Sequence, residues 1–184
     1  MAAKSNLKNM ALSLTLVCLV CSAILGCVYA VTSDPIKEAE QAKTTASIAR
    51  VLPAFEGQPS LESVNVDGVD YTYYRAPGAG YAVISSVVGF GGPLTLMVGI
   101  GEDGVVYNTV VLSHSETPGL GAKCTSDEGF IDQFKGWNPA EKQLSVRKDG
   151  GDVDAITAST ITSRAYAKAV ARACSVYIKL SENE

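Results

Sequence analysis

The sequence predicts an α+β chain in which a single N-terminal transmembrane helix precedes a mostly antiparallel sheet packed against helices. Three observations support this class. An uncharged apolar run lies near the N-terminus, the middle of the chain is rich in Val, Thr and Tyr with turn signals between short runs, and the C-terminal stretch has a helical apolar period. The 184 residues suffice for an anchor and one compact domain.

The apolar run extends from Met10 to Val31 and has the length that a helix needs to cross a bilayer, about 20 residues. Lys4 and Lys8 precede it, whereas acidic residues follow it at Asp34, Glu38 and Glu40. The positive-inside rule then places the N-terminus in the cytoplasm. We therefore predict a single-pass protein of the inner (cytoplasmic) membrane with everything after residue 32 on the outer, periplasmic side.

Two other interpretations of the apolar run stay open. A cleaved signal peptide has a shorter apolar core, of about 7–15 residues, and a small-x-small cleavage site. The sequence "ILGC", which ends at Cys27, loosely resembles a lipobox, but Leu25 is bulky where a small or β-branched residue is usual. The length of the run favours an uncleaved anchor over a cleaved or lipoprotein form.

The rest of the chain divides by pattern. We expect a cytoplasmic N-terminus over residues 1–9, the membrane helix over 10–31, a juxtamembrane helix or linker over 32–60 and the exported domain over 61–184. The juxtamembrane helix has Asp34 as its N-cap and Pro35 at its first helical position, and it stops at Pro53.

Within the exported domain, β-rich runs separated by turn signals such as Asp67-Gly68 predict strands over 63–66, 69–76, 81–90, 94–100 and 105–114. A short helix is expected within 125–137, a strand over 143–148 and an extended stretch over 152–156. The last helix, from about Ser159 to Leu180, has apolar residues on one face, which suits packing on a sheet.

Composition excludes several functions. With 15 basic and 19 acidic residues the net charge is −4, and no Lys/Arg cluster alternates with aromatics, so we expect no nucleic-acid partner. Cys18, Cys21 and Cys27 lie in the apolar run, where they suit packing. With one histidine and no cluster of ligand spacing, we expect no protein-bound metal. A disulfide between Cys124 and Cys174 is compatible with an exported domain and stays undecided.

The segment "DAITASTITS", Asp154 to Ser163, contains five hydroxyl side chains at Thr157, Ser159, Thr160, Thr162 and Ser163. It leads into the last helix, and a helix N-terminus is suited to hold a phosphate. Capping needs one hydroxyl, not a cluster. The only histidine, His114, is remote in sequence and no GxSxG elbow exists, so a hydrolase is a weak alternative. We therefore expect a hydroxyl that another enzyme modifies.

This segment resembles the flavinylation motif, D-x-x-S/T-G-A-T followed by S/T, of the FMN-binding domains in the Rnf complex G subunit and the Na⁺-translocating quinone reductase C subunit. In those families the last Thr carries FMN through a phosphoester that a flavin transferase makes. The resemblance implies that Thr160 is the acceptor, that Asp154 is the motif aspartate and that Thr157 is the S/T position. The chain departs from the motif at Ala158, where Gly is usual, and at Ser159, where Ala is usual and which adds a rival acceptor.

The resemblance covers essentially the whole chain, including "GFGGPLTLMVGI" (89–100), "VVLSHSETPGLGAKC" (110–124) and "FIDQFKG" (130–136), and the Rnf-type member matches better than the longer quinone reductase member. We expect the two Gly-containing loops to approach a flat ring closely. The flavin should then lie against Glu116, Thr117, Gly119 and Leu120, and near the backbone of Gly91 and Gly92. His114 is expected to be a strand-end histidine with a structural partner.

The resemblance implies an electron-transfer flavoprotein. It would be one component of a membrane-bound, ion-translocating oxidoreductase complex that exchanges electrons between ferredoxin and NAD, and its covalent FMN would relay electrons between the other subunits. Na⁺ or H⁺ as the coupling ion stays open. The C subunit of the Na⁺-translocating NADH:quinone reductase is an alternative, and so is a non-redox, membrane-anchored binding or regulatory module. Two of these three possibilities require a flavin, and the third does not.

Overall fold

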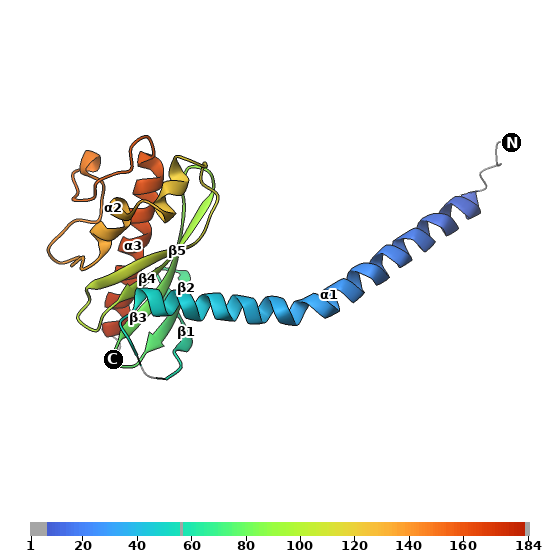
Figure 1. Cartoon of the computed structure of the whole chain (residues 1–184), viewed down its shortest axis with the longest axis horizontal. Coiled ribbons are helices and arrows are strands. Elements are labelled where there is room, and N and C mark those ends of the chain that lie inside the picture. Colours follow the sequence, from blue (N-terminus) through green and yellow to red (C-terminus); the bar gives the residue numbers. More distant parts are fainter. Residues whose placement is uncertain (1–6, 56, 183–184) are drawn as a thin grey trace. The chain divides into compact units, whose positions relative to one another are not determined.

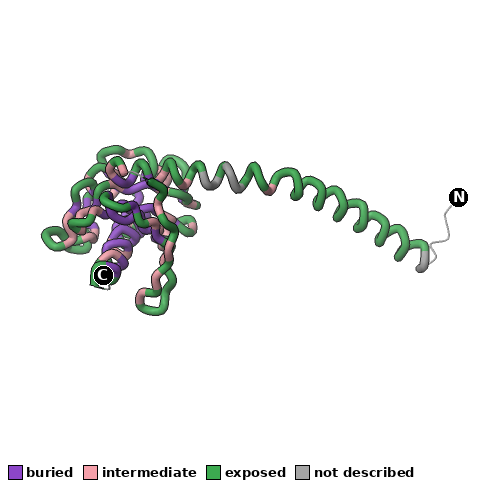
Figure 2. The backbone as a smooth tube through the Cα atoms, turned by 90° about the horizontal axis from the view of Figure 1, so that it is seen from below, coloured by how far each residue is buried: buried purple, intermediate pink, exposed green. Residues whose placement is uncertain are grey.

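The computed structural model describes residues 7–55 and 57–182 and divides into two compact units, residues 1–44 and 45–184. The first unit consists of most of helix α1 (Leu7–Val51). Its stretch Asn9–Ile36 is apolar and contains no buried residue, and Figure 2 shows it almost entirely in the green of exposed residues. In the described part of the chain this is the one helix long and apolar enough to cross a membrane, which supports the expected single-pass anchor.

The expected start of a separate helix at Asp34 is wrong. Helix α1 continues through this position, and Pro35 lies inside it. Extending an existing helix is easier than nucleating a new one, so the long apolar segment before Pro35 lets the helix absorb one missing backbone donor. The end of the helix at Val51, just before Pro53, agrees with the prediction.

The second unit is built on a five-stranded sheet in the order β1-β2-β3-β4-β5, with every neighbouring pair antiparallel (Figure 1). The strands are β1 (Ser60–Val66), β2 (Val69–Ala76), β3 (Gly80–Val88), β4 (Pro93–Ile100) and β5 (Val106–His114). All five predicted strands are present, within a few residues of the expected bounds. At the β1–β2 turn, Asp67 and Gly68 both have positive φ, 53° and 79°, as expected for a tight hairpin.

Each face of the sheet buries its own apolar cluster, because successive side chains of a strand point to opposite faces. Helix α3 (Thr160–Ser181) covers one face, where Leu94, Leu96, Val98 and Ile100 of β4 contact its buried stripe. The last turn of α1, with Ile48 and Val51, packs on the other face around Met97. The buried segments in Figure 2 belong to these layers. The structure confirms the predicted class of an antiparallel sheet packed against helices.

Short helices connect β5 to α3: η1 (Gly121–Thr125), α2 (Glu128–Ile131), η2 (Asp132–Phe134) and η3 (Arg147–Asp149). The helix expected within 125–137 is thus confirmed, with Phe130 and Phe134 buried. The strand expected over 143–148 is wrong. No strand lies beside it, and its backbone groups find partners in the loop instead, since the Gln143 N–H donates to the Asp152 carboxylate at 2.8 Å and Val146 forms a single bridge with Val153.

Candidate functional site

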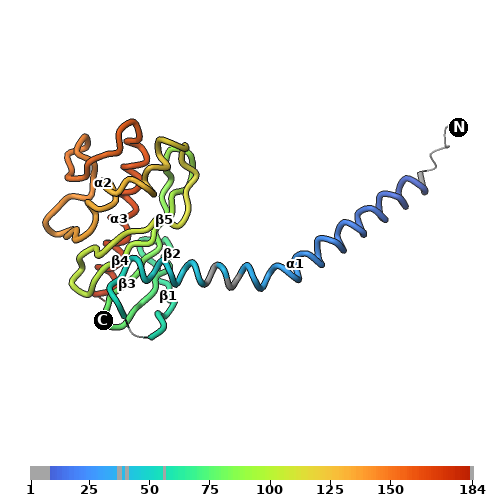
Figure 3. Tube along the Cα trace, in the orientation of Figure 1, coloured from blue at the N-terminus to red at the C-terminus, as the bar shows by residue number. Residues whose placement is uncertain are grey.

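Three connecting segments meet at one end of the domain and enclose a cavity of about 350 Å³. They are the β3–β4 hairpin, the loop between β5 and η1, and the turn before α3, and Figure 3 shows how they approach one another from distant parts of the chain. The lining is formed by Phe90, Glu116, Thr117, Leu120, Gly121, Ala158, Ser159, Thr160, Ile161 and Thr162. Apolar and hydroxyl side chains dominate it, and Glu116 is its only ionisable residue.

Glu116 connects the three segments through hydrogen bonds. The Phe90 N–H donates to its Oε1 and the Thr162 hydroxyl donates to its Oε2, both at 2.8 Å, and the residue is only 5% exposed. Gly89 and Gly121 make room for it, because a Cβ atom would lie 1.9 Å from Oε1 at Gly89 and 2.6 Å from Oε2 at Gly121. The carboxyl group therefore fixes the walls of the cavity relative to the start of α3.

Thr160 is the first residue of α3 and borders the cavity. The residue is half-buried, and no hydrogen bond of its hydroxyl is found within the described residues. The N-cap is Ser159, but the Ser159 side chain does not cap the helix. The N–H groups of Thr160, Ile161 and Thr162 therefore have neither an intrahelical acceptor nor a cap, so this end of the 22-residue helix is suited to an anionic group.

The hydroxyl groups of the segment before α3 have different environments, which explains their number. Ser163 is fully buried, accepts from the Ile156 N–H and donates to the Ser159 carbonyl, both at 3.0 Å. Thr162 binds Glu116, and Thr157 is exposed. Ser159 Oγ is buried and has no partner among the described residues. Ser163 and Thr162 therefore have structural roles, which leaves Thr160 as the accessible hydroxyl of this segment that borders the cavity.

The structure brings together Glu116, Thr117, Leu120, Ser159 and Thr160, five of the residues that the sequence indicated. Gly119 lies in the adjacent exposed turn, and Gly91 and Gly92 lie in the hairpin beside Phe90, but these three do not line the cavity.

Asp154 and Thr157 lie outside the cavity. Asp154 forms an exposed ion pair with Arg147 at 3.0 Å, and its backbone N–H donates to Gln133 Oε1 at 2.8 Å. Their assignment to the site stays a prediction. Sequence reasoning missed Phe90, Gly121, Ala158, Ile161 and Thr162 as lining residues. Phe90 had a signal, because it is an aromatic residue among glycines, whereas Gly121 and Ile161 had none.

His114 is the last residue of β5, and its Nδ1 accepts a hydrogen bond from the Glu116 N–H at 3.2 Å. This agrees with the expected strand-end histidine. Cys124 and Cys174 are both buried and free, so they form no disulfide. Burial, and secondarily the negative charge of Glu116, raise the pKa of the Cys124 thiol to about 11. Neither thiol therefore suits nucleophilic chemistry near neutral pH.

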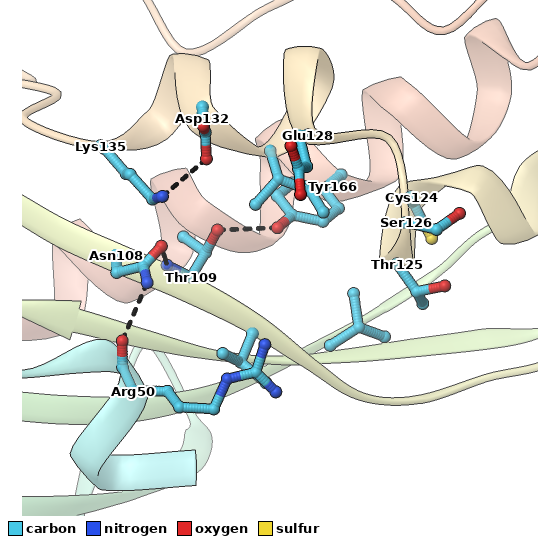
Figure 4. A pocket seen from close by; sticks show the side chains of 13 residues that line it. Arg50, Asn108, Thr109, Cys124, Thr125, Ser126, Glu128, Asp132, Lys135 and Tyr166 are labelled. Atoms are coloured by element: carbon cyan, nitrogen blue, oxygen red, sulfur yellow. Dashed lines mark hydrogen bonds and ion pairs between the residues drawn. The ribbon is translucent and has the colours of Figure 1, made fainter.

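A second cavity, of about 560 Å³, lies between β5 and the short helices (Figure 4). Its polar groups largely satisfy one another. Thr109 Oγ1 and Tyr166 Oη share a hydrogen bond of 2.7 Å, and Lys135 pairs with Asp132 at 2.7 Å. Because these partners are internal, the smaller cavity beside Thr160 is the stronger candidate site.

Comparisons with known proteins identify the family of the domain that contains the cavity. The family model of the FMN-binding domain matches residues 89–175, a range that contains all three segments around the cavity, and that of the RnfG N-terminal region matches residues 1–51. In fold, the chain is similar to a crystal structure of the C subunit of the Na⁺-translocating NADH-quinone reductase from Parabacteroides distasonis, with a TM-score of 0.59, 21% identity, and 78% of this chain and 94% of that chain covered.

The apolar helix and the match to the FMN-binding domain thus define a membrane-anchored protein with an FMN-binding domain. Among curated proteins, the chain is 33% identical to the G subunit of the ion-translocating oxidoreductase complex of Stutzerimonas stutzeri, over 92% of this chain and 80% of that protein. For the G subunit from Aliivibrio fischeri the identity is 32%, over 94% and 91%. The chain belongs to the family of these G subunits.

Proposed function

We propose that this chain is the electron-carrier subunit of a membrane-bound, ion-translocating oxidoreductase complex, and that it carries FMN esterified through its phosphate to Thr160. The observation that carries the proposal is the position of Thr160, at the uncapped N-terminus of a long helix and at the edge of a cavity in an FMN-binding domain. Bound FMN would supply reversible electron transfer.

The residues present fit a flavin mononucleotide. The N–H groups of the first three residues of α3 are suited to hold the phosphate, since they lack other acceptors and lie at the positive end of the helix dipole. Phe90, Leu120 and Ile161 supply apolar contact for a flat ring and exclude water from it. The unpartnered hydroxyl of Ser159 lies in the same wall, where a bound polar group could complete it after a small rotation.

Thr160 is a better acceptor than Ser159 because an attached group must be able to reach the hydroxyl. Ser159 Oγ is buried, whereas Thr160 is half-buried. A threonine hydroxyl with no adjacent base is a weak nucleophile, so a separate flavin transferase must make the ester. Thr160 then acts as a tether that keeps the cofactor on the outer side of the membrane, where no cytoplasmic FMN pool can refill the site.

The membrane anchor suits a protein that works within a larger complex. The names of the relatives support the other subunits of such a complex as partners.

The lysines before the apolar run support a cytoplasmic N-terminus and an outer FMN domain. A C-terminal alkaline phosphatase fusion should be active and a C-terminal green fluorescent protein fusion dark. The reverse result would contradict this orientation.

In-gel flavin fluorescence after denaturing electrophoresis tests the proposal. The wild type, coexpressed with a flavin transferase, should give a fluorescent band that Thr160→Ala abolishes. Thr157→Ala is the matched control, because Thr157 is an exposed hydroxyl outside the cavity. A dark wild-type band, with the transferase active on a control substrate, would favour a non-redox binding module. A bright Thr160→Ala band would move the acceptor to Ser159.

A further inference from the structure

The cavity beside Thr160 is lined by one ionisable side chain, that of Glu116, and no cationic side chain pairs with it. Every other lining residue is uncharged, and none of the ion pairs in the described part of the chain includes Glu116. The three segments around the cavity, 88–93, 115–122 and 155–163, contain no Lys or Arg. A buried carboxyl group without a cation is costly and calls for an explanation.

The hydrogen bonds of Glu116 fit an ionised carboxylate. Both of its oxygens accept, one from the Phe90 N–H and one from the Thr162 hydroxyl. An ionised carboxylate is an acceptor only, so two donors suit it well. The histidine at the end of β5 contacts the backbone of Glu116 and not its carboxylate, since His114 Nδ1 accepts a hydrogen bond from the Glu116 N–H.

We propose that the buried Glu116 carboxylate tunes the electron affinity of the flavin, its negative charge at the wall of the cavity making the ring harder to reduce. The inference rests on the proposed function, since it requires FMN in this cavity. Each electron that the ring accepts adds a negative charge, and protons from solvent compensate this charge only in part at neutral pH. The Glu116 carboxylate is itself only 5% exposed, so solvent screens its repulsion of the reduced ring weakly.

The size of the effect follows from the size of the cavity. At an effective dielectric constant of about 20, a unit charge roughly 8 Å away changes an equilibrium constant by more than about tenfold. Replacing Glu116 by Gln keeps the shape of the side chain and one acceptor for the Phe90 N–H but removes the charge. Glu116→Gln should therefore shift the ratio of reduced to oxidised flavin at a fixed poise by at least about tenfold toward the reduced form.

A redox titration of the full-length, flavinylated protein in detergent, followed by flavin absorbance with mediator dyes, tests this inference. Glu128→Gln is the charge-matched control, because Glu128 is exposed on α2 and does not line the cavity. Thr162→Val is the structural comparison, because it removes one hydrogen bond to Glu116 and keeps the carboxylate, so its shift should be smaller than that of Glu116→Gln. The Glu128→Gln control should stay within about threefold of the wild-type ratio, and the Glu116→Gln shift should persist at high salt.

A Glu116→Gln ratio within about threefold of the wild type would overturn the inference, and so would an equal shift in Thr162→Val. If Glu116→Gln does not fold or load flavin, Glu116→Met is the second neutral variant, because its side chain has a similar length and carries no charge. A shift of about tenfold toward the reduced form in Glu116→Met supports the tuning role, and a ratio within about threefold of the wild type contradicts it. Fluorescence of the same samples on a denaturing gel separates the two proposals, since a loaded wild type with no Glu116 effect refutes the tuning alone.

Discussion

Ala158 adopts a left-handed backbone conformation, with φ of +61°, in the turn that presents Thr160 to the cavity. This is the position where the flavinylation motif usually has Gly. The chain therefore forms the turn with an alanine, for which the left-handed conformation is unfavourable. A left-handed residue other than Gly costs about 1–2 kcal/mol, part of which the greater freedom of Gly in the unfolded chain offsets.

Ala158→Gly should therefore stabilise the protein by about 0.5–1 kcal/mol, measured by thermal unfolding of the full chain in detergent. Ala171→Gly is the matched control, because the same change inside α3 should destabilise by about 0.5–1 kcal/mol. If both substitutions lower the melting temperature equally, the turn is not strained at Ala158.

Ser163 stabilises the same turn through its side chain. Its hydroxyl bonds to the Ile156 N–H and the Ser159 carbonyl and is fully buried. Ser163→Ala leaves a buried N–H without a partner and should destabilise the protein by about 1–3 kcal/mol in urea unfolding. Ser175→Ala, which removes an exposed hydroxyl of the same helix, should change stability by about 0.5 kcal/mol or less. Equal losses would show that the Ser163 bonds do not hold the turn.

At the residue scale, the sequence indicated the hydroxyl cluster but not the different hydrogen-bond partners of its members. Local composition marks five hydroxyls, whereas only tertiary contacts assign Thr162 to Glu116 and Ser163 to Ile156. Likewise, the "GFGGP" and "SETPGLG" loops looked like separate turns. In the structure the Glu116 carboxyl group joins the two loops through the Phe90 N–H. Phe90 and Glu116 are 26 positions apart, so no local sequence pattern contains this contact.

At the scale of elements, the strands of the meander were predictable because each pairs with its neighbour in sequence and has turn signals at both ends. The segment 143–148 has similar β propensity but no strand to pair with, so it forms a loop and η3. Helix α1 shows the opposite case, since Pro35 is a local stop signal that the surrounding helix overrides. Propensity decided the outcome only where tertiary pairing agreed with it.

The end of α1 meets the sheet at a close approach of two backbones. A Cβ atom at Gly99 of β4 would lie 1.8 Å from the Val51 carbonyl oxygen. Gly99→Ala must therefore push the last turn of α1 away from Met97 and should destabilise the domain by about 1–3 kcal/mol, measured by urea unfolding. Gly129→Ala is the control, because its added carbon meets nothing closer than 3.4 Å. A loss no larger than that of the control would mean that α1 does not rest on β4.

At the scale of the whole molecule, the buried titratable groups predict how stability depends on pH. Burial raises the pKa of Cys124 to about 11 and that of Cys174 to about 12. The pKa values of Tyr73 and Tyr166 are raised to about 12, in both cases chiefly by burial. The unfolded chain therefore releases these protons at a lower pH than the folded chain does.

The sign of the effect follows from linkage. The neutral forms contribute their full stability below the ordinary thiol pKa of about 9, and this contribution is lost as the pH rises from about 9 toward 12. We expect the free energy of unfolding to fall steadily above about pH 9 in urea titrations of Thr160→Ala protein, which keeps flavin chemistry out of the measurement. Adding Cys124→Ala and Cys174→Ala should lower stability at neutral pH through the cavities left behind, yet make the fall between about pH 9 and 11 shallower. A fall equally steep with and without the thiols would show that other groups drive alkaline unfolding.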